Sequence, residues 1–582
     1  MATLQPPDEV PYAFRVMVVG DSISHGREGD WTWRYRIWQW FRKEGVAVRF
    51  VGPYTGTVPP NDPHPPRPPR CPDDPADAAP VVRTHGGYAA GVDPEFLANS
   101  AHFSGSGRLA LQAKDLIAEQ VAAYQPDICL VELGFNDLAW LRCDPIEVLT
   151  SIETLVHRAR SAKHNLKFAI ANIPHRTSLP GRDDLPLSTN RYNETLARSI
   201  PKWSLPESPI ALVRFCENYS CGGNNSKAAY DGLHPNALGE FQIAQAFSRT
   251  LISAFSLGRT PLEMPSNVPA RPLNVPAQLK AVSDPSGIIA SWEPVYGAYG
   301  YDLHHRRAGQ TRWSQTHVDC NRYYWQQLRK GDTVECRVRA SGGDFLKSSW
   351  TQVVSAMAQP LTPLPPSNIR AHADTSELVI SWDPPPPPPA GELDRFSVTL
   401  FDGDRTGAYP LVTGVRGNKI MIPNLIPGHK YFILLSTWSS VGQGVTAGTR
   451  AVRAGRGRPC PPRFILAKAI DSTTVEVSWP DVAGAAGYDV WYRRGFPLPC
   501  SREADSSKLV ARKAPVVHDR ICTGWKAIVS DLKPCVWEWE FAVTAYNGSD
   551  DSPIFRWVTA PRLTTEASLT TDDTVHITIT CG

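Results

Sequence analysis

The chain has 582 residues, too many for one domain of the usual length of roughly 100 to 200 residues. Its net charge is +3, from 60 basic and 57 acidic side chains that are mixed along the sequence. This mixing excludes the concentrated basic patch that nucleic acid requires. No uninterrupted apolar run reaches about 18 residues, so the sequence predicts no membrane-spanning helix.

Cysteines and glycosylation sequons favour an extracellular protein with disulfides. The 12 cysteines include three plausibly spaced pairs, Cys216/Cys221, Cys320/Cys336 and Cys500/Cys522, and sequons begin at Asn193, Asn218, Asn224 and Asn547. Against this, the N-terminus shows no basic-plus-apolar signal segment. We therefore expect an extracellular location, with a cytoplasmic one as the alternative.

A short apolar run at residues 16–19 predicts a buried strand in the middle of a parallel sheet. The run stops at Gly20, and Asp21 and Ser22 follow it. Open α/β sheets present their chemistry at the carboxyl ends of their strands. Ser22 is therefore a candidate nucleophile, provided that the rest of the chain supplies a base, an acid and an oxyanion site.

Strands and helices alternate over residues 12–256, which predicts a parallel sheet with helices on both faces. Helices are expected at 31–44, 109–124, 145–162, 188–202 and 237–255, and further strands at 46–52, 127–134, 167–173 and 210–215. A long segment rich in Pro, Gly and Asp, residues 53–106, interrupts the alternation. A loop of this length inside a domain is usually functional or poorly ordered.

Two further polar groups follow predicted strands. Asp231 and His234 are three residues apart in a turn, so the carboxylate can support an imidazole that accepts the Ser22 proton. Asn136, within residues 134–137, offers an amide donor for a developing oxyanion. Each motif alone is an ordinary turn or cap. Their joint occurrence at strand ends indicates nucleophilic catalysis.

Three segments, Gly20–Ile23, Gly134–Asp137 and Asp231–His234, resemble the first, third and fifth blocks of the SGNH (GDSL-type) hydrolases. The resemblance covers about residues 12–256. It implies a flavodoxin-like α/β/α fold and ester hydrolysis with no cofactor or metal. Ser22, Asp231 and His234 would be the triad, and Ser22, a second-block glycine and Asn136 would form the oxyanion hole.

The second-block glycine is either Gly107 or Gly87. The family places this glycine directly before the helix that precedes the strand leading to the Gly134–Asp137 segment. Gly107 fits that position, and its N–H is expected at a helix N-terminus, where the partial positive charge favours an anion. Gly87 remains the alternative, although the segment around it is more typical of a loop that forms a wall of the site.

The second half repeats a β-sandwich pattern three times. After a proline-rich linker at 257–275, an early Ser-Trp recurs at Trp292, Trp382 and Trp479. Each tryptophan is followed by an aromatic strand and a Leu-containing corner, as in fibronectin type III domains, which these units resemble. The expected domains span 276–360, 363–455 and 458–562, with a β-prone tail at 563–582. Their aromatic residues are interpreted as sandwich cores, and carbohydrate or protein are their candidate ligands.

The sequence as a whole predicts a serine esterase that carries accessory sandwiches. The sequence also predicts a polar, aromatic-walled cleft, which suits acetyl esters of carbohydrates, polysaccharides among them. Its expected residues are Trp31, Trp33, Arg70, Arg83, His85 and Tyr88. A lipase or acylhydrolase of lipid esters is one alternative. A binding or adhesion protein that uses the hydrolase domain as a scaffold is another.

Overall fold

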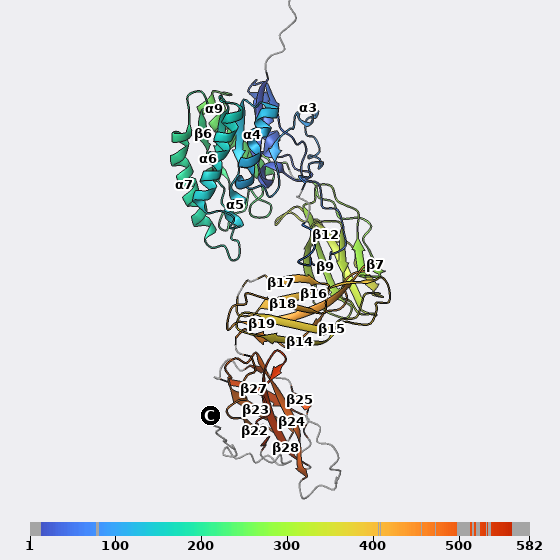
Figure 1. The fold of residues 1–582 in the computed structure, drawn as a ribbon. Coiled ribbons are helices and arrows are strands. Elements are labelled where there is room, and N and C mark those ends of the chain that lie inside the picture. The colour runs from blue at the N-terminus through green and yellow to red at the C-terminus, as the bar shows by residue number, and fades with distance from the viewer. Residues whose placement is uncertain are drawn as a thin grey trace, which may run out of the picture.

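The computed structural model describes residues 13–76, 81–269, 271–405, 407, 409–455, 457–471, 473–497, 512–514, 517–518, 524–530, 532 and 537–560. An α/β domain is followed by three all-β units in chain order (Figure 1). The expected tail at 563–582 and the pair Cys500/Cys522 lie outside the described residues. Among the helices of the described part, none is both long and apolar enough to cross a membrane.

The central sheet of the α/β domain has the strand order β2-β1-β4-β5-β6, and every neighbouring pair is parallel. The strands are β1 Phe14–Gly20, β2 Val48–Phe50, β4 Ile128–Glu132, β5 Lys167–Ala171 and β6 Ile210–Val213, and short β3 Phe103–Ser104 also pairs with β1. Without β3, this is the flavodoxin-like order. The predicted fold class of this domain is confirmed.

Five long helices agree with the predicted ones. They are α2 Trp33–Lys43, α4 Ala110–Tyr124, α6 Pro145–Ala162, α7 Leu185–Trp203 and α9 Ala237–Phe255. Helix α4 packs on α6, and α2 packs on α9, where Trp33 stacks on Phe247 with ring centroids 4.6 Å apart. Four short helices fall in segments without a predicted helix: α1 Ser22–His25, α3 Pro94–Leu97, α5 Phe135–Ala139 and α8 Phe215–Asn218.

The first sandwich pairs the sheet β10-β9-β12-β13 with the sheet β11-β8-β7. Its strands are β7 Lys280–Asp284, β8 Gly287–Ser291, β9 Gly300–Arg307, β10 Ser314–Val318, β11 Arg322–Trp325, β12 Thr333–Ser341 and β13 Val354–Met357. All of the pairings within the two sheets are antiparallel.

The second and third sandwiches repeat this architecture. The second has β14 Ser367–Ala373, β15 Leu378–Asp383, β16 Leu393–Asp402, β17 Leu411–Val415, β18 Lys419–Ile422, β19 Lys430–Ser439, β20 Ala447–Gly448 and β21 Val452–Arg453. The third has β22 Leu466–Ala469, β23 Val475–Pro480, β24 Gly487–Pro497, β25 Arg512–Ala514, β26 Val517–His518, β27 Gly524–Val529, β28 Trp537–Asn547, β29 Asp550–Asp551 and β30 Val558–Thr559.

The three repeated tryptophans lie in the sandwich cores, because each is at most 3% exposed. Each one meets an aromatic ring of the following strand edge-on, at centroid distances of 5.2 to 5.5 Å: Trp292–Tyr301, Trp382–Phe396 and Trp479–Tyr488. Such edge-to-face contacts add to the stability gained from burial. The interpretation of these aromatic residues as core agrees with their positions.

The proline-rich linker and the long loop of the α/β domain both pack on neighbouring units. Trp40 donates to the Thr260 carbonyl of the linker at 2.7 Å, and linker residue Leu262 is buried. Part of the long loop, residues 57–76, runs along the sandwiches (Figure 1). There the Gly414 N–H donates to the Arg70 carbonyl at 2.7 Å, and Arg395 pairs with Asp74 at 2.7 Å. Linker and loop therefore join the domains.

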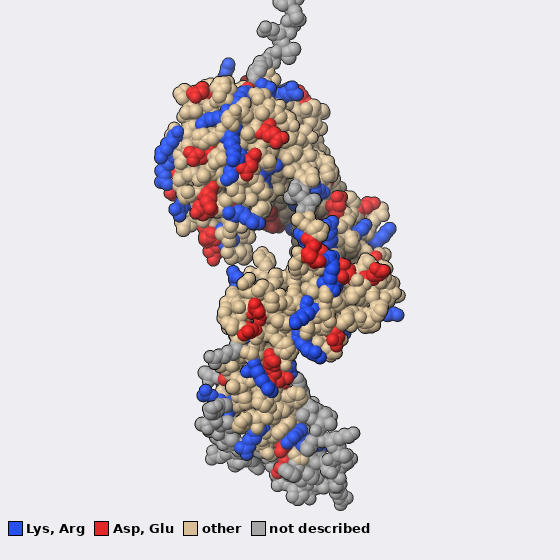
Figure 2. All heavy atoms as spheres, in the orientation of Figure 1, with Lys and Arg blue, Asp and Glu red and all other residues tan. Residues whose placement is uncertain are grey.

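The described cysteines are free thiols, so the expected pairs Cys216/Cys221 and Cys320/Cys336 are not disulfides here. Cys221 donates instead to the Gly232 carbonyl at 3.0 Å, and Cys336 is buried in the core of the first sandwich. On the face shown in Figure 2, positive and negative side chains are interspersed, as the sequence predicted.

Candidate active site

Ser22 lies at the carboxyl end of β1, as the first residue of the short helix α1. Asp21 caps this helix, because its carboxylate accepts the Ile23 N–H at 2.9 Å. The cap turns the chain sharply after the strand and presents the Ser22 hydroxyl at the edge of the sheet. The serine thus follows an interior strand, as expected, but belongs to a helix.

The structure brings Ser22, His234 and Asp231 into one hydrogen-bonded chain. Ser22 Oγ lies 2.8 Å from His234 Nε2, and His234 Nδ1 lies 2.7 Å from Asp231 Oδ2. The second carboxylate oxygen of Asp231 accepts the backbone N–H of His234 at 2.9 Å. This places the imidazole between a hydroxyl and a fixed carboxylate, the arrangement in which it can act as a general base.

The turn that carries this pair depends on a glycine. Gly232 has a φ of +78°, which disfavours any residue with a side chain. A Cβ at this position would lie 1.9 Å from Thr177 Oγ1. The Gly232 carbonyl in turn accepts the Thr177 N–H at 2.9 Å, so the turn is also tied to the segment that follows β5.

The pKa of Asp231 lies below its usual value. Burial alone would raise it, but the hydrogen bonds from the His234 ring and from the backbone N–H groups of His234 and Leu233 outweigh burial. Asp231 is therefore an anion over the pH range in which esterases work, and it can stabilise a protonated His234.

Asn136 follows strand β4, as expected, but lies in the short helix α5. The N-cap of this helix is Gly134, which lies two residues after the end of β4 and has a φ of +113°. The Asn136 amide donates to the Arg108 carbonyl at 3.2 Å and to Asp21 Oδ2 at 3.3 Å. Both bonds are long, so the amide can exchange one of them for a developing oxyanion.

Gly107 has a φ of +73° and lies under the Trp140 ring, which a Cβ there would approach to 3.1 Å. Within the described part of the chain, the N–H groups of Gly107 and Ser22 have no hydrogen-bond acceptor. Gly87 lies elsewhere, against the first sandwich, where a Cβ would meet Tyr296 at 2.5 Å.

The expectation that Gly107 sits at the N-terminus of a helix is wrong. Helix α4 begins at Ala110, and its first N–H groups, those of Ala110 and Leu111, donate to the Asp137 carboxylate at 2.8 and 3.1 Å. Asp137 thus neutralises the positive end of the helix. Any contribution of Gly107 to anion binding comes from its own N–H group.

Sequence reasoning missed a buried pair of acids beneath the nucleophile. Asp21 and Glu132 are 1% and 2% exposed, and Glu132 accepts the Ser24 hydroxyl at 2.8 Å. Burial raises the pKa of both carboxyl groups, and the neighbouring Asp21 raises that of Glu132 further. A shared proton between them relieves the repulsion of two buried charges. The β1–β4 register, which sets Gly20 opposite Glu132, was the missing signal.

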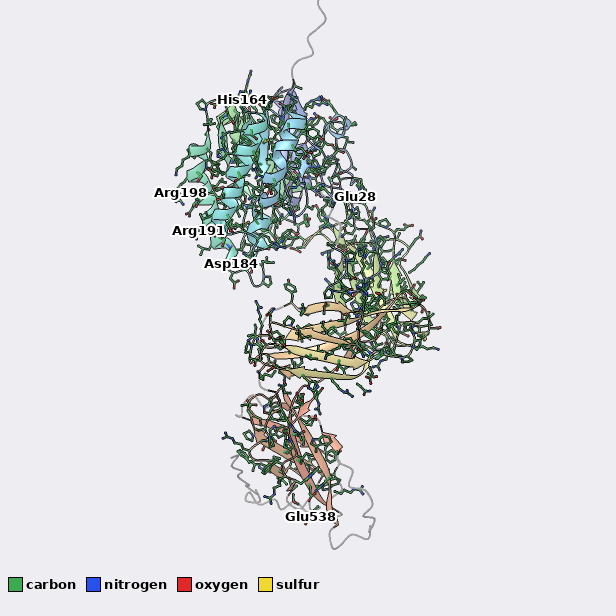
Figure 3. The ribbon with its side chains drawn as sticks, viewed as in Figure 1. Glu28, His164, Asp184, Arg191, Arg198 and Glu538 are labelled. Carbon is green, nitrogen blue, oxygen red and sulfur yellow. The ribbon has the colours of Figure 1, made fainter. Side chains whose placement is uncertain are left out.

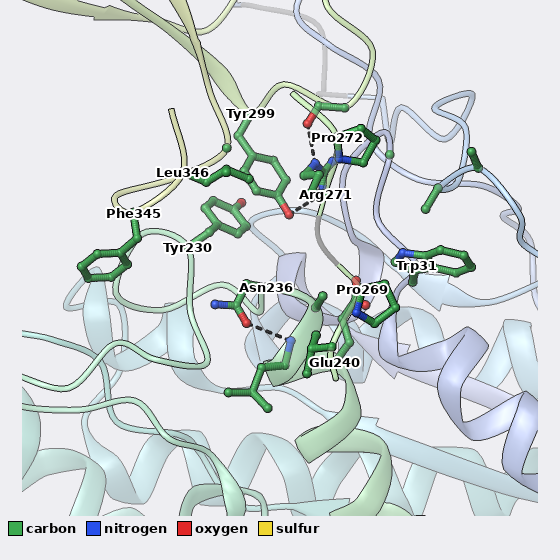
Figure 4. Close-up of a pocket in the computed structure, with 18 of the residues that line it drawn as sticks. Trp31, Tyr230, Asn236, Glu240, Pro269, Arg271, Pro272, Tyr299, Phe345 and Leu346 are labelled. Atoms are coloured by element: carbon green, nitrogen blue, oxygen red, sulfur yellow. Dashed lines mark hydrogen bonds between the residues drawn. The ribbon is translucent and has the colours of Figure 1, made fainter. Parts of the chain in front are cut away.

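Tyr230 is a second residue that the sequence did not single out. Its ring is nearly parallel to that of His234, with an 18° interplanar angle and centroids 5.6 Å apart. Tyr230 also borders a cavity of about 430 Å³ between the α/β domain, the linker and the first sandwich (Figure 4). The cavity is lined mainly by apolar and aromatic side chains, which include Trp31, Tyr299, Phe345 and Leu346.

The structure does not assemble the cleft expected from the sequence. Arg70 lies by the second sandwich, Arg83 donates to the Pro60 carbonyl and Asn61, and Trp33 is fully buried in the core. Trp31 lines the interdomain cavity, and Tyr88 is buried next to it, where its carbonyl accepts the Tyr296 hydroxyl. The long loop follows the sandwiches, and this path separates the predicted residues.

One group of potential metal ligands occurs among the described residues, formed by Cys71, Asp73 and Asp74. Arg416 and Arg395 already neutralise its carboxylates; Arg416 reaches Asp73 at 2.7 Å and also pairs with Asp74. Burial raises the pKa of the Cys71 thiol, which disfavours the thiolate that metals bind. The group therefore fits an interdomain ion-pair cluster better than a cation site.

His25, at the end of α1, predicts a pH-dependent stability. Burial, together with the positive charges of Arg34 and Arg108, lowers its pKa to about 3 from 6.5. Below pH 6.5 the unfolded chain binds a proton on His25 that the folded chain does not bind. The contribution of His25 to stability therefore decreases as the pH is lowered. Between about pH 6.5 and 4.5 the stability advantage of the wild type over His25→Asn should shrink by about 2 to 3 kcal/mol.

Hydrogen exchange of α2 and α4 peptides in urea would measure this difference for the α/β domain. The buried acids, whose raised pKa values act in the opposite direction, are present in both proteins and cancel in the comparison. His164→Asn is the matched control, because His164 is exposed at the end of the domain remote from the sandwiches (Figure 3). A constant stability difference for His25→Asn would contradict the prediction.

Comparison with known proteins agrees with this geometry. Residues 16–247 match the family model of the GDSL-like lipase/acylhydrolases. This part of the chain is a GDSL-like lipase/acylhydrolase domain. Such domains are carboxylic ester hydrolases, as the sequence predicted. Residues 364–452, the second sandwich, match the model of the fibronectin type III domain.

Two curated proteins are similar to part of this chain. Protein sidekick-1 of Gallus gallus is 26% identical over 181 residues, 29% of this chain and 8% of that protein. Receptor-type tyrosine-protein phosphatase F of Bos taurus is 26% identical over 275 residues, 45% of this chain and 13% of that protein. The chain thus spans a small fraction of the length of these curated relatives.

Among solved structures, a carbohydrate esterase family 3 protein from Talaromyces cellulolyticus is 21% identical, with a TM-score of 0.30. The match covers 42% of this chain and 98% of that one. The FN1–FN3 domains of chicken CNTN1 are 14% identical, with a TM-score of 0.18, and the match covers 50% and 99% of the two chains.

Proposed function

We propose that the GDSL-type domain hydrolyses short-acyl esters, above all acetyl esters, of carbohydrates. Ser22 is the nucleophile, His234 the general base and Asp231 the residue that orients it. The observation that carries the proposal is the unbroken hydrogen-bonded chain from Ser22 Oγ through His234 to Asp231, with distances of 2.8 and 2.7 Å. No metal or cofactor takes part in this chemistry.

The reaction follows from the positions of these groups. His234 Nε2 removes the Ser22 proton as Oγ attacks the ester carbonyl, and the imidazolium that forms is stabilised by Asp231. The oxyanion accepts hydrogen bonds from the N–H groups of Ser22 and Gly107 and from the Asn136 amide. His234 then protonates the leaving alcohol, and water, activated in the same way, hydrolyses the acyl-enzyme.

The surroundings of Gly107 support a small acyl group. The Trp140 ring lies against Gly107, beside the proposed oxyanion site, and forms a bulky wall there. A long acyl chain would need an apolar channel past this wall. Acetyl and similarly short groups fit without displacing the indole.

The groups near His234 support a polar, ring-shaped alcohol. The Tyr230 ring lies stacked beside the base that protonates the leaving group, so the surroundings of that base are aromatic. Arg27, whose guanidinium lies 5.7 Å from the Tyr299 ring centroid and whose charge acts on the Tyr230 hydroxyl, adds a cation nearby. Aromatic faces combined with a few polar donors are a usual design for binding sites that need orientation as well as contact.

The test is a substrate series with the purified full chain. Aryl esters of increasing acyl length give kcat/KM as a function of chain length, and acetylated xylan or pectin reports the release of acetate. We expect the highest kcat/KM for acetyl esters, measurable acetate release, and a steady fall beyond about four acyl carbons as Trp140 obstructs the chain. A preference for long acyl chains would instead assign the domain to lipid esters.

A Trp140→Ala variant sharpens this test. Removal of the indole should raise kcat/KM for longer acyl chains while leaving the acetyl ester little changed, because the catalytic groups are untouched. The exposed Leu187→Ala on α7 is the matched control, since it also removes a large apolar side chain from the surface. An unchanged acyl-length profile in Trp140→Ala would show that another wall sets the acyl size.

A further inference from the structure

The catalytic base is the first member of a stack of three aromatic rings that crosses the domain boundary. Tyr230 lies between His234 on one side and Tyr299, from the first sandwich, on the other. The Tyr230 and Tyr299 rings are 3.8 Å apart at their centroids and inclined by 20°. Figure 4 shows these two tyrosines face to face at the edge of the interdomain cavity. The sandwich thus reaches the histidine through a single intervening ring.

Tyr299 is itself rigidly held, because it is 5% exposed and its hydroxyl joins a buried charge network. The hydroxyl donates to Asp30 of the α/β domain at 2.7 Å and accepts from Arg271 of the linker at 2.6 Å. Arg271 also pairs with Asp30 and donates to the Glu28 carbonyl at 2.6 Å, at the domain boundary marked by Glu28 in Figure 3. Two other segments of the chain, residues 28–30 and the linker, therefore fix the outer ring of the stack.

The same sandwich contacts the backbone of the catalytic turn. The Tyr230 N–H donates to the His234 carbonyl at 2.9 Å and closes the turn that holds Asp231. The Tyr230 carbonyl accepts the Asp344 N–H at 2.7 Å, from the loop that follows β12. Both the ring and the backbone of Tyr230 are thus held by the first sandwich, while its other contacts hold His234.

We infer that the first sandwich is a working part of the active site and that Tyr299 is a positioning residue, which acts on His234 through Tyr230. The inference rests on the proposed role of His234 as the general base. A base within hydrogen-bond reach of the nucleophile loses efficiency when its ring can tilt or shift by a fraction of an ångström. The Tyr299–Tyr230 stack restricts that movement. An accessory module thereby helps to set the rate of the chemical step.

The experiment uses the full chain and compares Tyr299→Ala with Tyr299→Phe. The alanine variant removes the ring and should lower kcat about 10-fold to 100-fold, with KM for a small aryl acetate changed less than about twofold. The labelling rate of Ser22 by a fluorophosphonate should fall in parallel. The phenylalanine variant keeps the ring and loses only the hydroxyl, so it should restore most of kcat.

Tyr296→Ala is the matched control. Tyr296 comes from the same loop and also bonds to the α/β domain, through its hydroxyl and the Tyr88 carbonyl at 2.5 Å, but it contacts no residue of the catalytic turn in the described structure. It should leave kcat unchanged. Equal losses in Tyr296→Ala and Tyr299→Ala would show that only general domain docking matters and would overturn the inference, as would an unchanged kcat in Tyr299→Ala.

Ser22→Ala separates this inference from the proposed function. If Ser22→Ala is inactive and Tyr299→Ala is fully active, the positioning role fails while the triad stands. If Ser22→Ala retains the wild-type rate, the triad fails, and the positioning role that rests on it fails as well.

Discussion

Replacing Ser22 with alanine should lower kcat for an aryl acetate by about 10⁶-fold, the loss typical of removing a triad nucleophile. The Ser22 hydroxyl lies 2.8 Å from the base, and alanine supplies no nucleophile in its place. What remains is the contribution of the oxyanion donors and of substrate binding. Steady-state hydrolysis by the purified full chain, with mass spectrometry of fluorophosphonate-treated protein, measures both rate and site.

A matched serine variant guards against a general loss of structure. Ser161, exposed near the end of α6, donates only to the Arg158 carbonyl within its own helix. Ser161→Ala should keep the wild-type rate, and both variants should keep the wild-type melting temperature. If Ser22→Ala turns over substrate at the wild-type rate, or if the fluorophosphonate attaches to another residue, the nucleophile lies elsewhere.

The second large effect is expected for Asp231→Asn, which should lower kcat by about 10⁴-fold. The amide is nearly isosteric with the carboxylate, but its NH₂ group can face His234 Nδ1 and favour the tautomer that cannot accept the Ser22 proton. The imidazolium of the transition state also loses its counter-charge. KM should change little, because Asp231 reaches substrate only through His234.

Measurement of kcat and KM from about pH 5 to 9 tests this prediction. The lowered pKa of wild-type Asp231 keeps it ionised over that range, so no choice of pH should rescue the amide variant. Asp183→Asn, an exposed change of the same charge on the segment before α7, is the control and should be silent. A loss of less than about tenfold in Asp231→Asn would point to a dyad of Ser22 and His234 alone.

Much of the α/β domain could be predicted because its sequence signals are local. The apolar run before Gly20 gave β1, and apolar periodicity placed α4 and α6 almost to the residue. The relation of Ser22 to His234 was also accessible, since both follow strand ends and parallel strands bring those ends together. The distance between the two groups then follows from the fold.

What could not be predicted depends on contacts between distant parts of the chain. No feature of the sequence near Glu132 indicates that the strand register places it beside Asp21. Likewise, no local pattern links Tyr299 to His234, which lies 65 positions earlier in the chain. The positions of Arg70 and Arg83 could not be predicted, because a proline-rich loop has no periodicity from which its path would follow. The capping of α4 by Asp137 has no local signal either, because the carboxylate and the Ala110 N–H that it accepts are 27 positions apart.

The loop of residues 57–76 has a mechanical consequence. It leaves the α/β domain and holds the second sandwich through the Asp74–Arg395 ion pair and the Arg70–Gly414 backbone bond, while Arg271 of the linker donates to the Gly297 carbonyl and the Tyr299 hydroxyl of the first sandwich. The α/β domain and the first two sandwiches are thus joined in a closed ring, with the opening seen in Figure 2 between the α/β domain and the second sandwich. In a closed ring, no junction between two units can bend without a change at the other junctions. Bending between the sandwiches must therefore either break the loop contacts or transmit force to the catalytic domain.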